Sequence, residues 1–296
     1  MKMFTSIRKI LTFLLISFNL YSQDRIISEV DLLISERKFE EAENILITEI
    51  NKKESTELIE ILGDIYGYQK EWEKAEIEYQ KIIKMNPDNA NYYFKYGGAL
   101  GMLALENKMK GLVLVNDIEQ AFLKTVELDS KHLEVRWALV EFYIQLPGIL
   151  GGSYKKANEY ADQLGKIKII EGLLAKSYIA DYRKIEAEAE KFSRKAMEYV
   201  DTVNEDYPRN NINYQIGKTA ANYNINLEDG IKHLNRYIKN YSLADNVSLD
   251  WIYLQLARIY KLKYDKNKAL ISIEKALEIK PDFKWAIKIK GEIEAM

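Results

Sequence analysis

Two segments of the chain carry the same pattern of small and apolar residues. Counting from Asp250, the pattern consists of Tyr253, Leu256, Ala257, Tyr260, Ala269, Ile273, Ala276 and Pro281. Counting from Thr56, the same offsets hold Ile59, Leu62, Gly63, Tyr66, Ala75, Tyr79, Ile82 and Pro87. Small residues at fixed places let two helices cross closely, and a proline cannot continue the second helix. A recurrence of this kind, with a period of about 34 residues, predicts an array of stacked helix pairs.

The spacing resembles that of the tetratricopeptide repeat. The resemblance implies an all-α fold, a right-handed α-α superhelix of about seven helix pairs with a C-terminal capping helix. No alternating strand pattern appears anywhere in the chain. The alternative is a helical domain without repeats, in which the small residues coincide by chance. The predicted repeats are 23–55, 56–89, 90–132, 133–167, 168–209, 210–249 and 250–282, followed by a cap at 283–296.

Three of the repeats depart from the regular length. The third needs about nine extra residues, which we expect as an enlarged loop around Glu106 to Leu114. The fourth has an enlarged loop at 146–153, whose last residue, Ser153, is placed to cap the next helix. The fifth is expected to have a long second helix that continues through Val200 and Val203 toward Pro208.

The first 22 residues have the pattern of a secretory signal peptide. Lys2, Arg8 and Lys9 precede an apolar stretch at 10–20, and Ser22 offers a small residue at a cleavage point. The alternative is an uncleaved N-terminal anchor. This pattern predicts an exported protein, located in the periplasm of a Gram-negative bacterium. No other apolar run is long enough to predict a membrane span.

Composition excludes several classes of function. The chain has no cysteine, so it has neither a disulfide framework nor a thiol for lipid attachment. The formal charge is −2, and removal of 1–22, with three cations and no carboxylate, makes it −5. A mildly acidic chain lacks the positive patch that nucleic-acid binding requires.

No catalytic or metal-binding pattern is found in the sequence. The two histidines, His132 and His233, are far apart and are expected to be surface or capping residues. The glycines between Gly97 and Gly101 lack the spacing of a nucleotide-binding loop and are expected to allow close helix packing. Repeated carboxylates near Glu186 are expected on a solvated helix face. We therefore predict no enzymatic activity, no cofactor and no metal.

The resemblance implies a candidate binding groove, because the first helix of each tetratricopeptide repeat lines the concave face at fixed offsets. Carried onto this sequence, those offsets are acidic toward the N-terminus and basic toward the C-terminus, with aromatic residues along the length. Rings surrounded by charge are typical of peptide-recognition surfaces. The alternative is that the charges are solvated and the rings pack against neighbouring repeats. The candidate peptide-binding residues are Glu57, Glu60, Asp64, Asn91, Phe94, Trp137, Glu141, Tyr214, Lys218, Trp251, Arg258 and Lys261.

These observations predict a non-catalytic scaffold or adaptor for protein–protein interaction in the bacterial envelope, which binds a peptide segment of an unidentified protein partner. One alternative is a solute- or glycan-binding helical component of an envelope uptake system, although such proteins are usually lipid-anchored. The other is an enzyme with a site in the 146–153 loop, which contains mainly Gly, Leu and Ile. The sequence does not specify the pathway or the oligomeric state.

Overall fold

The computed structural model describes residues 23–296, and within this range every regular element is a helix. The predicted all-α class and the stacked helix pairs are thus confirmed. The predicted signal peptide at 1–22 lies outside the described residues. None of the described helices combines the length and the apolar character that crossing a bilayer requires.

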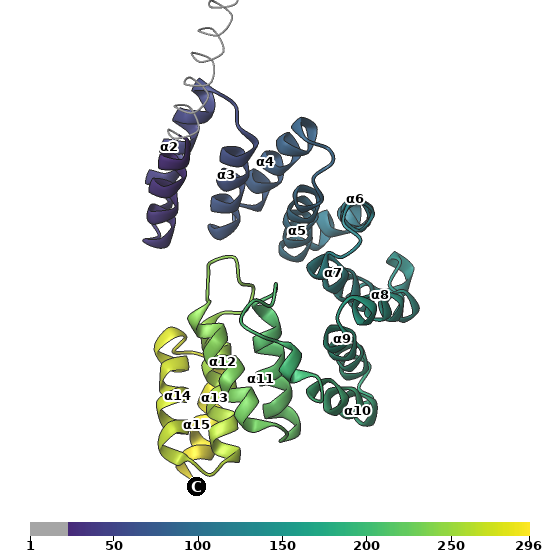
Figure 1. Ribbon diagram of the computed structural model, residues 1–296, viewed down its shortest axis with the longest axis vertical. Helices are drawn as coiled ribbons and strands as arrows, with labels where there is room; N and C mark the ends of the chain where they lie inside the picture. The colour runs from purple at the N-terminus through teal and green to yellow at the C-terminus, as the bar shows by residue number, and fades with distance from the viewer. Residues whose placement is uncertain (1–22) are drawn as a thin grey trace, which may run out of the picture. The chain divides into compact units, whose positions relative to one another are not determined.

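The chain divides into two compact units, with the boundary between Asp129 and Ser130. This boundary falls three residues from the predicted junction between the third and fourth repeats. The described helices of the first unit follow one another in pairs along the chain (Figure 1). The helices of the first unit are 23–35, α2 (Phe39–Lys52), α3 (Thr56–Tyr68), α4 (Trp72–Met85), α5 (Ala90–Glu106) and α6 (Lys108–Leu128).

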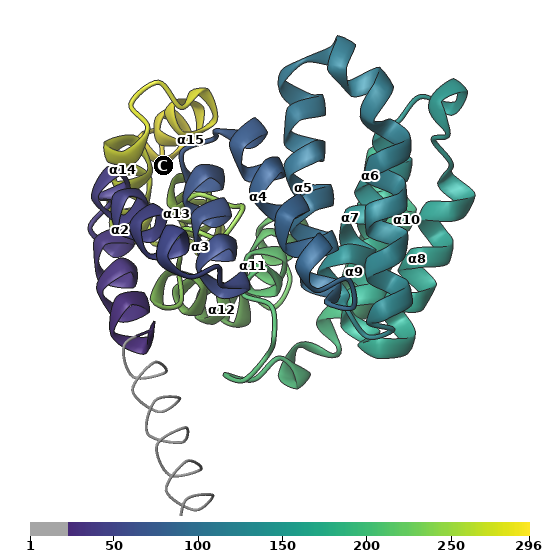
Figure 2. The ribbon, with the colours of Figure 1, turned by 90° about the horizontal axis from the view of Figure 1, so that it is seen from above.

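The predicted loop around 106–114 does not exist. The extra residues instead lengthen α5 and α6 to 17 and 21 residues, joined through Asn107 alone (Figure 2). The side chain of Asn107 accepts hydrogen bonds from the backbone N–H groups of Met109 and Lys110, at 3.0 and 3.2 Å, and so begins α6. No proline interrupts the segment, and Gly111 lets the two helices meet closely, since a Cβ there would lie 3.0 Å from the carbonyl oxygen of Ala104.

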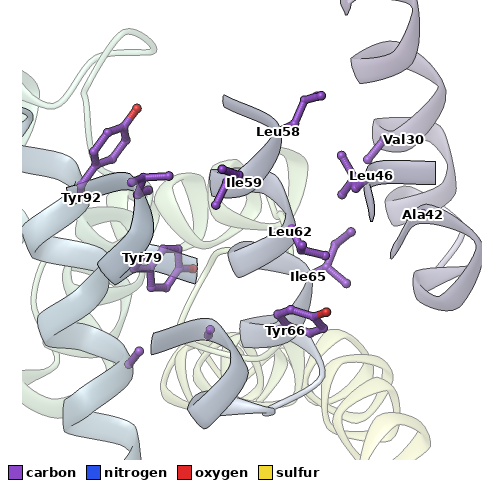
Figure 3. Packing of buried hydrophobic residues seen from close by; sticks show 13 residues of the cluster. Val30, Ala42, Leu46, Leu58, Ile59, Leu62, Ile65, Tyr66, Tyr79 and Tyr92 are labelled. Atoms are coloured by element: carbon purple, nitrogen blue, oxygen red, sulfur yellow. The ribbon is translucent and has the colours of Figure 1, made fainter. Parts of the chain in front are cut away.

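The hydrophobic core of the first unit runs between successive helices (Figure 3). Val30 and Leu46 are fully buried, and they lie on the side of α3 that carries Ile65 (Figure 3). The ring of Tyr79 from α4 packs against α3 from the other side, where a Cβ on Gly63 would lie 2.6 Å from a ring carbon. Gly63 therefore marks a close helix crossing, as the sequence pattern predicts.

The second unit continues the series of helix pairs and ends in a single helix. The loop at 146–153 contains a short 3-10 helix, η1 (Gly148–Leu150), and Ser153 caps α8 by accepting a hydrogen bond from the Lys156 N–H, as predicted. The helices of the second unit are α7 (Leu133–Gln145), α8 (Tyr154–Ile167), α9 (Ile169–Tyr182), α10 (Glu186–Met197), α11 (Asn211–Tyr223), α12 (Leu227–Lys239), α13 (Leu249–Leu262), α14 (Lys266–Ile279) and α15 (Lys284–Glu294).

The predicted long helix in the fifth repeat is wrong. Helix α10 ends at Met197, and the chain continues as a short 3-10 helix, η2 (Val200–Thr202), and an irregular segment up to Asn210. Val200 and Val203 are buried, but they are β-branched residues, which favour helices less than the residues of α10 do. The irregular segment brings Arg209 back onto α9, where it forms an ion pair with Glu171.

The prediction for the two histidines is half correct. His132 caps α7, because its Nδ1 accepts a hydrogen bond from the Val135 N–H at 3.2 Å. His233 of α12 is not a surface residue: it is buried, and its Nδ1 lies 2.7 Å from the Asn213 Oδ1. Its burial could not be inferred from a single isolated position in the sequence.

Candidate functional site

Several candidate residues in the first unit are joined in one network of ion pairs and hydrogen bonds. The Nζ of Lys95 lies 2.6 Å from a carboxylate oxygen of Glu60 and 2.7 Å from one of Asp64. Asn91 donates to Glu60 at 2.9 Å, and the Tyr79 hydroxyl donates to Asp64 at 2.8 Å. Burial raises the pKa of Asp64 against the opposing attraction of Lys95. The predicted acidic character of this part is therefore reduced, because the ammonium group of Lys95 pairs with two of the three candidate carboxylates.

The remaining first-unit candidates have ordinary packing contacts. Glu57 accepts a hydrogen bond from the Gln23 side chain at 2.7 Å. The ring of Phe94 packs 6.2 Å from that of Phe122. Among the neighbouring glycines, Gly97 meets Phe122 closely, whereas Gly98 and Gly101 face open space. The expectation of close helix packing is therefore correct for Gly97 and wrong for Gly98 and Gly101.

The second unit contains two adjoining cavities, which together we call the unit-2 groove. The first cavity has a volume of about 210 Å³ and lies among α7, α9, α10 and α11. The second has a volume of about 630 Å³ and lies among α11, α13 and α15. Their walls share five residues, so they are parts of one surface. These shared residues are Tyr214, Lys218, Asn222, Asn246 and Val247.

The first cavity contains both signs of charge. Glu141 and Asp181 contribute carboxylates, and Lys218 contributes an ammonium group. Solvent reaches Glu141, yet the surrounding protein raises the pKa of its carboxyl by desolvation, against the attraction of Arg209 and Lys218. Trp137 is also in this wall, as predicted, but only 5% of it is exposed because its Nε1 donates to Glu171 at 2.6 Å. Trp137 therefore serves mainly as a structural residue.

The second cavity is lined by cations and indole rings. Lys218, Arg258 and Lys288 contribute the cations, and Trp251 and Trp285 contribute the rings. No carboxylate lies in its wall.

Neighbouring side chains hold two of these groups in place. Arg258 donates from Nη1 to the amide oxygens of Asn222 and Gln255, at 2.8 and 2.7 Å. Burial lowers the pKa of Arg258, but a guanidinium remains charged at neutral pH. Trp251 packs edge-on against Phe283, with ring centroids 4.8 Å apart. The last candidate, Lys261, forms an ion pair with Glu292 and lies outside the walls of both cavities.

Six of the twelve candidates therefore line the unit-2 groove. They are Trp137, Glu141, Tyr214, Lys218, Trp251 and Arg258. Within residues 23–296, no group of three or more His, Cys, Asp or Glu side chains is arranged to hold a metal ion.

No family profile and no curated protein matches this chain. A tetratricopeptide repeat protein from Parabacteroides merdae matches 92% of this chain and 98% of its own, at 13% identity and a TM-score of 0.51. The chain has the tetratricopeptide-repeat fold. Yeast Tom70 matches 88% of this chain and 52% of its own, at 15% identity and a TM-score of 0.51. A chain of the APC/C heterotetramer Cut9–Hcn1 matches 90% and 55%, at 14% identity and the same TM-score.

Two groove residues in the capping helix were missed by the sequence analysis. Trp285 and Lys288 of α15 line the second cavity. The repeat offsets concern the first helix of a pair, whereas 283–296 was expected only as a cap. If Lys284 is taken as the start of another tetratricopeptide repeat, Trp285 and Lys288 fall at the positions that Trp251 and Leu254 occupy from Asp250. The cap therefore contributes to the groove as a first helix does.

Proposed function

We propose that this protein is a non-catalytic interaction protein that binds a peptide segment of a partner in the unit-2 groove. The observation that carries the proposal is the second cavity, where two indole rings and three cations from three successive first helices surround an open volume of about 630 Å³. Preformed helices present these side chains, so binding requires little ordering of the protein itself. Aromatic and arginine side chains are also the groups that most often dominate binding energy at protein interfaces.

Selection of peptides from a random displayed library tests this proposal. The protein comprising residues 23–296 serves as the target, and enriched peptides are measured again on two variants. We expect Trp285→Ala to weaken binding about tenfold or more, as for an aromatic hot spot. Ile287→Ala is the matched control, because Ile287 is an exposed apolar residue of the same helix that lies outside the cavity wall. Failure to enrich any peptide, or equal loss in both variants, would refute the groove assignment.

We also propose that the protein is exported to the periplasm, because Lys2, Arg8, Lys9 and the apolar stretch at 10–20 have the pattern of a signal peptide. N-terminal sequencing of protein recovered from cells tests this. The proposal predicts a mature end within a few residues of Gln23. Recovery of a chain that still begins at Met1 would contradict cleavage.

A further inference from the structure

The wall of the second cavity contains three cations and no carboxylate. Lys218 extends from α11, Arg258 from α13 and Lys288 from α15. Among the interactions of the described residues, none of these three cations forms an ion pair with a carboxylate.

Two acidic groups near the second cavity are engaged by other partners, and Glu141 of the first cavity is attracted by Lys218 at the shared wall. Glu292 forms an ion pair with Lys261, while the charges of Lys288 and Arg258 also help to lower its pKa. Asp250 is buried and accepts a hydrogen bond from the Ser248 hydroxyl. Neither residue lies in the wall of the second cavity, so no carboxylate within that wall opposes the three cations.

Apolar groups accompany the cations. Trp251, Leu254 and Ile289 form part of the same wall, and Trp285 is 62% exposed at its edge. An exposed indole beside lysines is suited to an apolar side chain whose neighbours carry negative charge. The first cavity, in contrast, contains the carboxylates Glu141 and Asp181, which would repel an acidic segment.

We infer that the second cavity binds an acidic peptide segment in which side-chain carboxylates flank an apolar residue. The inference rests on the proposed function and specifies its partner. The three cations lie on the first helices α11, α13 and α15, so they match several carboxylates along a segment better than the single carboxylate of a chain end. The apolar residue lies against Trp285, and the carboxylates lie among Lys218, Arg258 and Lys288.

The test uses synthetic peptides with acetylated and amidated ends, so that side chains are the only source of carboxylates. One peptide alternates Glu with Leu and Phe, and a second has Gln in place of every Glu. Binding to residues 23–296 is followed by calorimetry at low and high salt. We expect the Glu peptide to bind at least about tenfold more tightly than the Gln peptide, with the difference shrinking at high salt.

Three variants locate the binding. Lys218→Gln, Arg258→Gln and Lys288→Gln should each weaken binding of the Glu peptide several-fold. The matched control is Lys191→Gln, since Lys191 is an exposed lysine of α10, in the same unit but outside both cavity walls. A charge reversal provides a test by increased affinity. The Lys288→Glu variant should bind a peptide with Lys in place of Glu more tightly than the unaltered protein does.

The outcomes separate this inference from the proposed function. Library peptides whose binding depends on Trp285 but which contain no acidic residues would contradict the inference of an acidic partner segment. The proposed peptide groove would still stand. Equal binding of the Glu and Gln peptides would also overturn the inference. An equal loss in Lys191→Gln would show that only net charge is sensed, and would overturn it as well. A failure of every peptide, including the library, would remove the proposed function itself.

Discussion

At the scale of single residues, Glu171 accepts hydrogen bonds from three side chains of the second unit. Its carboxylate is fully buried and accepts hydrogen bonds from Trp137 at 2.6 Å, Tyr207 at 3.1 Å and Arg209 at 3.1 and 3.2 Å. Trp137 is 34 residues before Glu171, and Arg209 is 38 residues after it, so one side chain links the fourth repeat to both ends of the fifth. This network explains why Trp137 is buried rather than available as an anchor.

Replacement of Glu171 by glutamine should strongly destabilise the second unit. The change keeps the shape but leaves the buried guanidinium of Arg209 without its counter-charge, which typically costs about 3–5 kcal/mol. Urea unfolding measures the loss. The control is Glu198→Gln, an exposed residue for which the change should stay within about 0.5 kcal/mol. Similar stabilities for the two variants would show that the network contributes little.

His233 should make the protein less stable in mild acid. Burial, helped by the positive charges of Arg236 and Lys232, lowers the pKa of His233 to about 4, while Asp229 and Glu205 oppose the shift. An unfolded chain has a histidine pKa of about 6.5. The folded state therefore favours the neutral ring, and this contribution is fully present above pH 6.5 and is lost as the pH falls toward 4. The loss should reach about 3 kcal/mol.

Unfolding experiments on a neutral variant isolate this effect from the titration of carboxylates. His233→Gln removes the titrating group and keeps an amide that can bond to Asn213. The free energy of unfolding should fall less between pH 7 and pH 4.5 in the variant than in the unaltered protein. Identical pH dependence in both proteins would contradict the prediction.

At the scale of elements, the turns inside the helix pairs contain residues with left-handed backbone. Arg37, Lys70, Lys184 and Tyr264 have φ between 57° and 63°, and each lies between the two helices of a pair. This conformation is unfavourable for residues other than glycine. The chain adopts it because the turn must be short enough for the two helices to pack against each other.

Lys184→Gly should therefore stabilise the protein. Lys184 is exposed, with φ of 59°, so the change relieves backbone strain and removes little packing. The gain should be about 0.5–1 kcal/mol after the larger entropy of glycine in the unfolded chain is included. Thermal unfolding checks it, with Lys191→Gly, inside α10, as the opposite control that should lose about 1 kcal/mol. A lower melting temperature for Lys184→Gly would contradict the strain argument.

The elements also show which parts of the fold follow from sequence. The pairs 56–89 and 250–282 could be predicted because Gly63, Ala75, Ala257 and Ala269 report close crossings directly. The structure of the extra residues around 106–114 could not be predicted, because a longer loop and two longer helices add the same number of residues. The Asn107 cap, which begins α6 directly after α5, favours the longer helices. The groove positions on α11 and α13 could be predicted from the repeat offsets. The burial of Trp137 could not, because it depends on a hydrogen bond to Glu171, which is distant in the sequence.

At the scale of the whole molecule, the chain divides into two units, and the groove belongs to the second. Both cavities lie entirely within residues 130–296. A solenoid is stabilised by contacts between neighbouring repeats, so a set of consecutive repeats can fold without the rest.

A fragment comprising residues 130–296 should fold and bind the same peptides as residues 23–296. Circular dichroism should show helix, and peptide affinities should agree within about threefold, since the groove residues are all present. The complementary fragment, 23–129, is the control and should not bind. Peptide binding by 23–129 at similar affinity would contradict placement of the site in the second unit.

The most direct test of the central claim, that the unit-2 groove receives a partner segment, is photo-crosslinking in the cell that makes the protein. A photoreactive phenylalanine analogue is placed at Trp285, in the groove wall, and in a second strain at Ile271, an exposed apolar residue of α14 outside both cavities. The predicted result is a discrete adduct with a partner protein from position 285 and none from position 271. No adduct at position 285, or the same adducts from both positions, would contradict a groove-directed interaction.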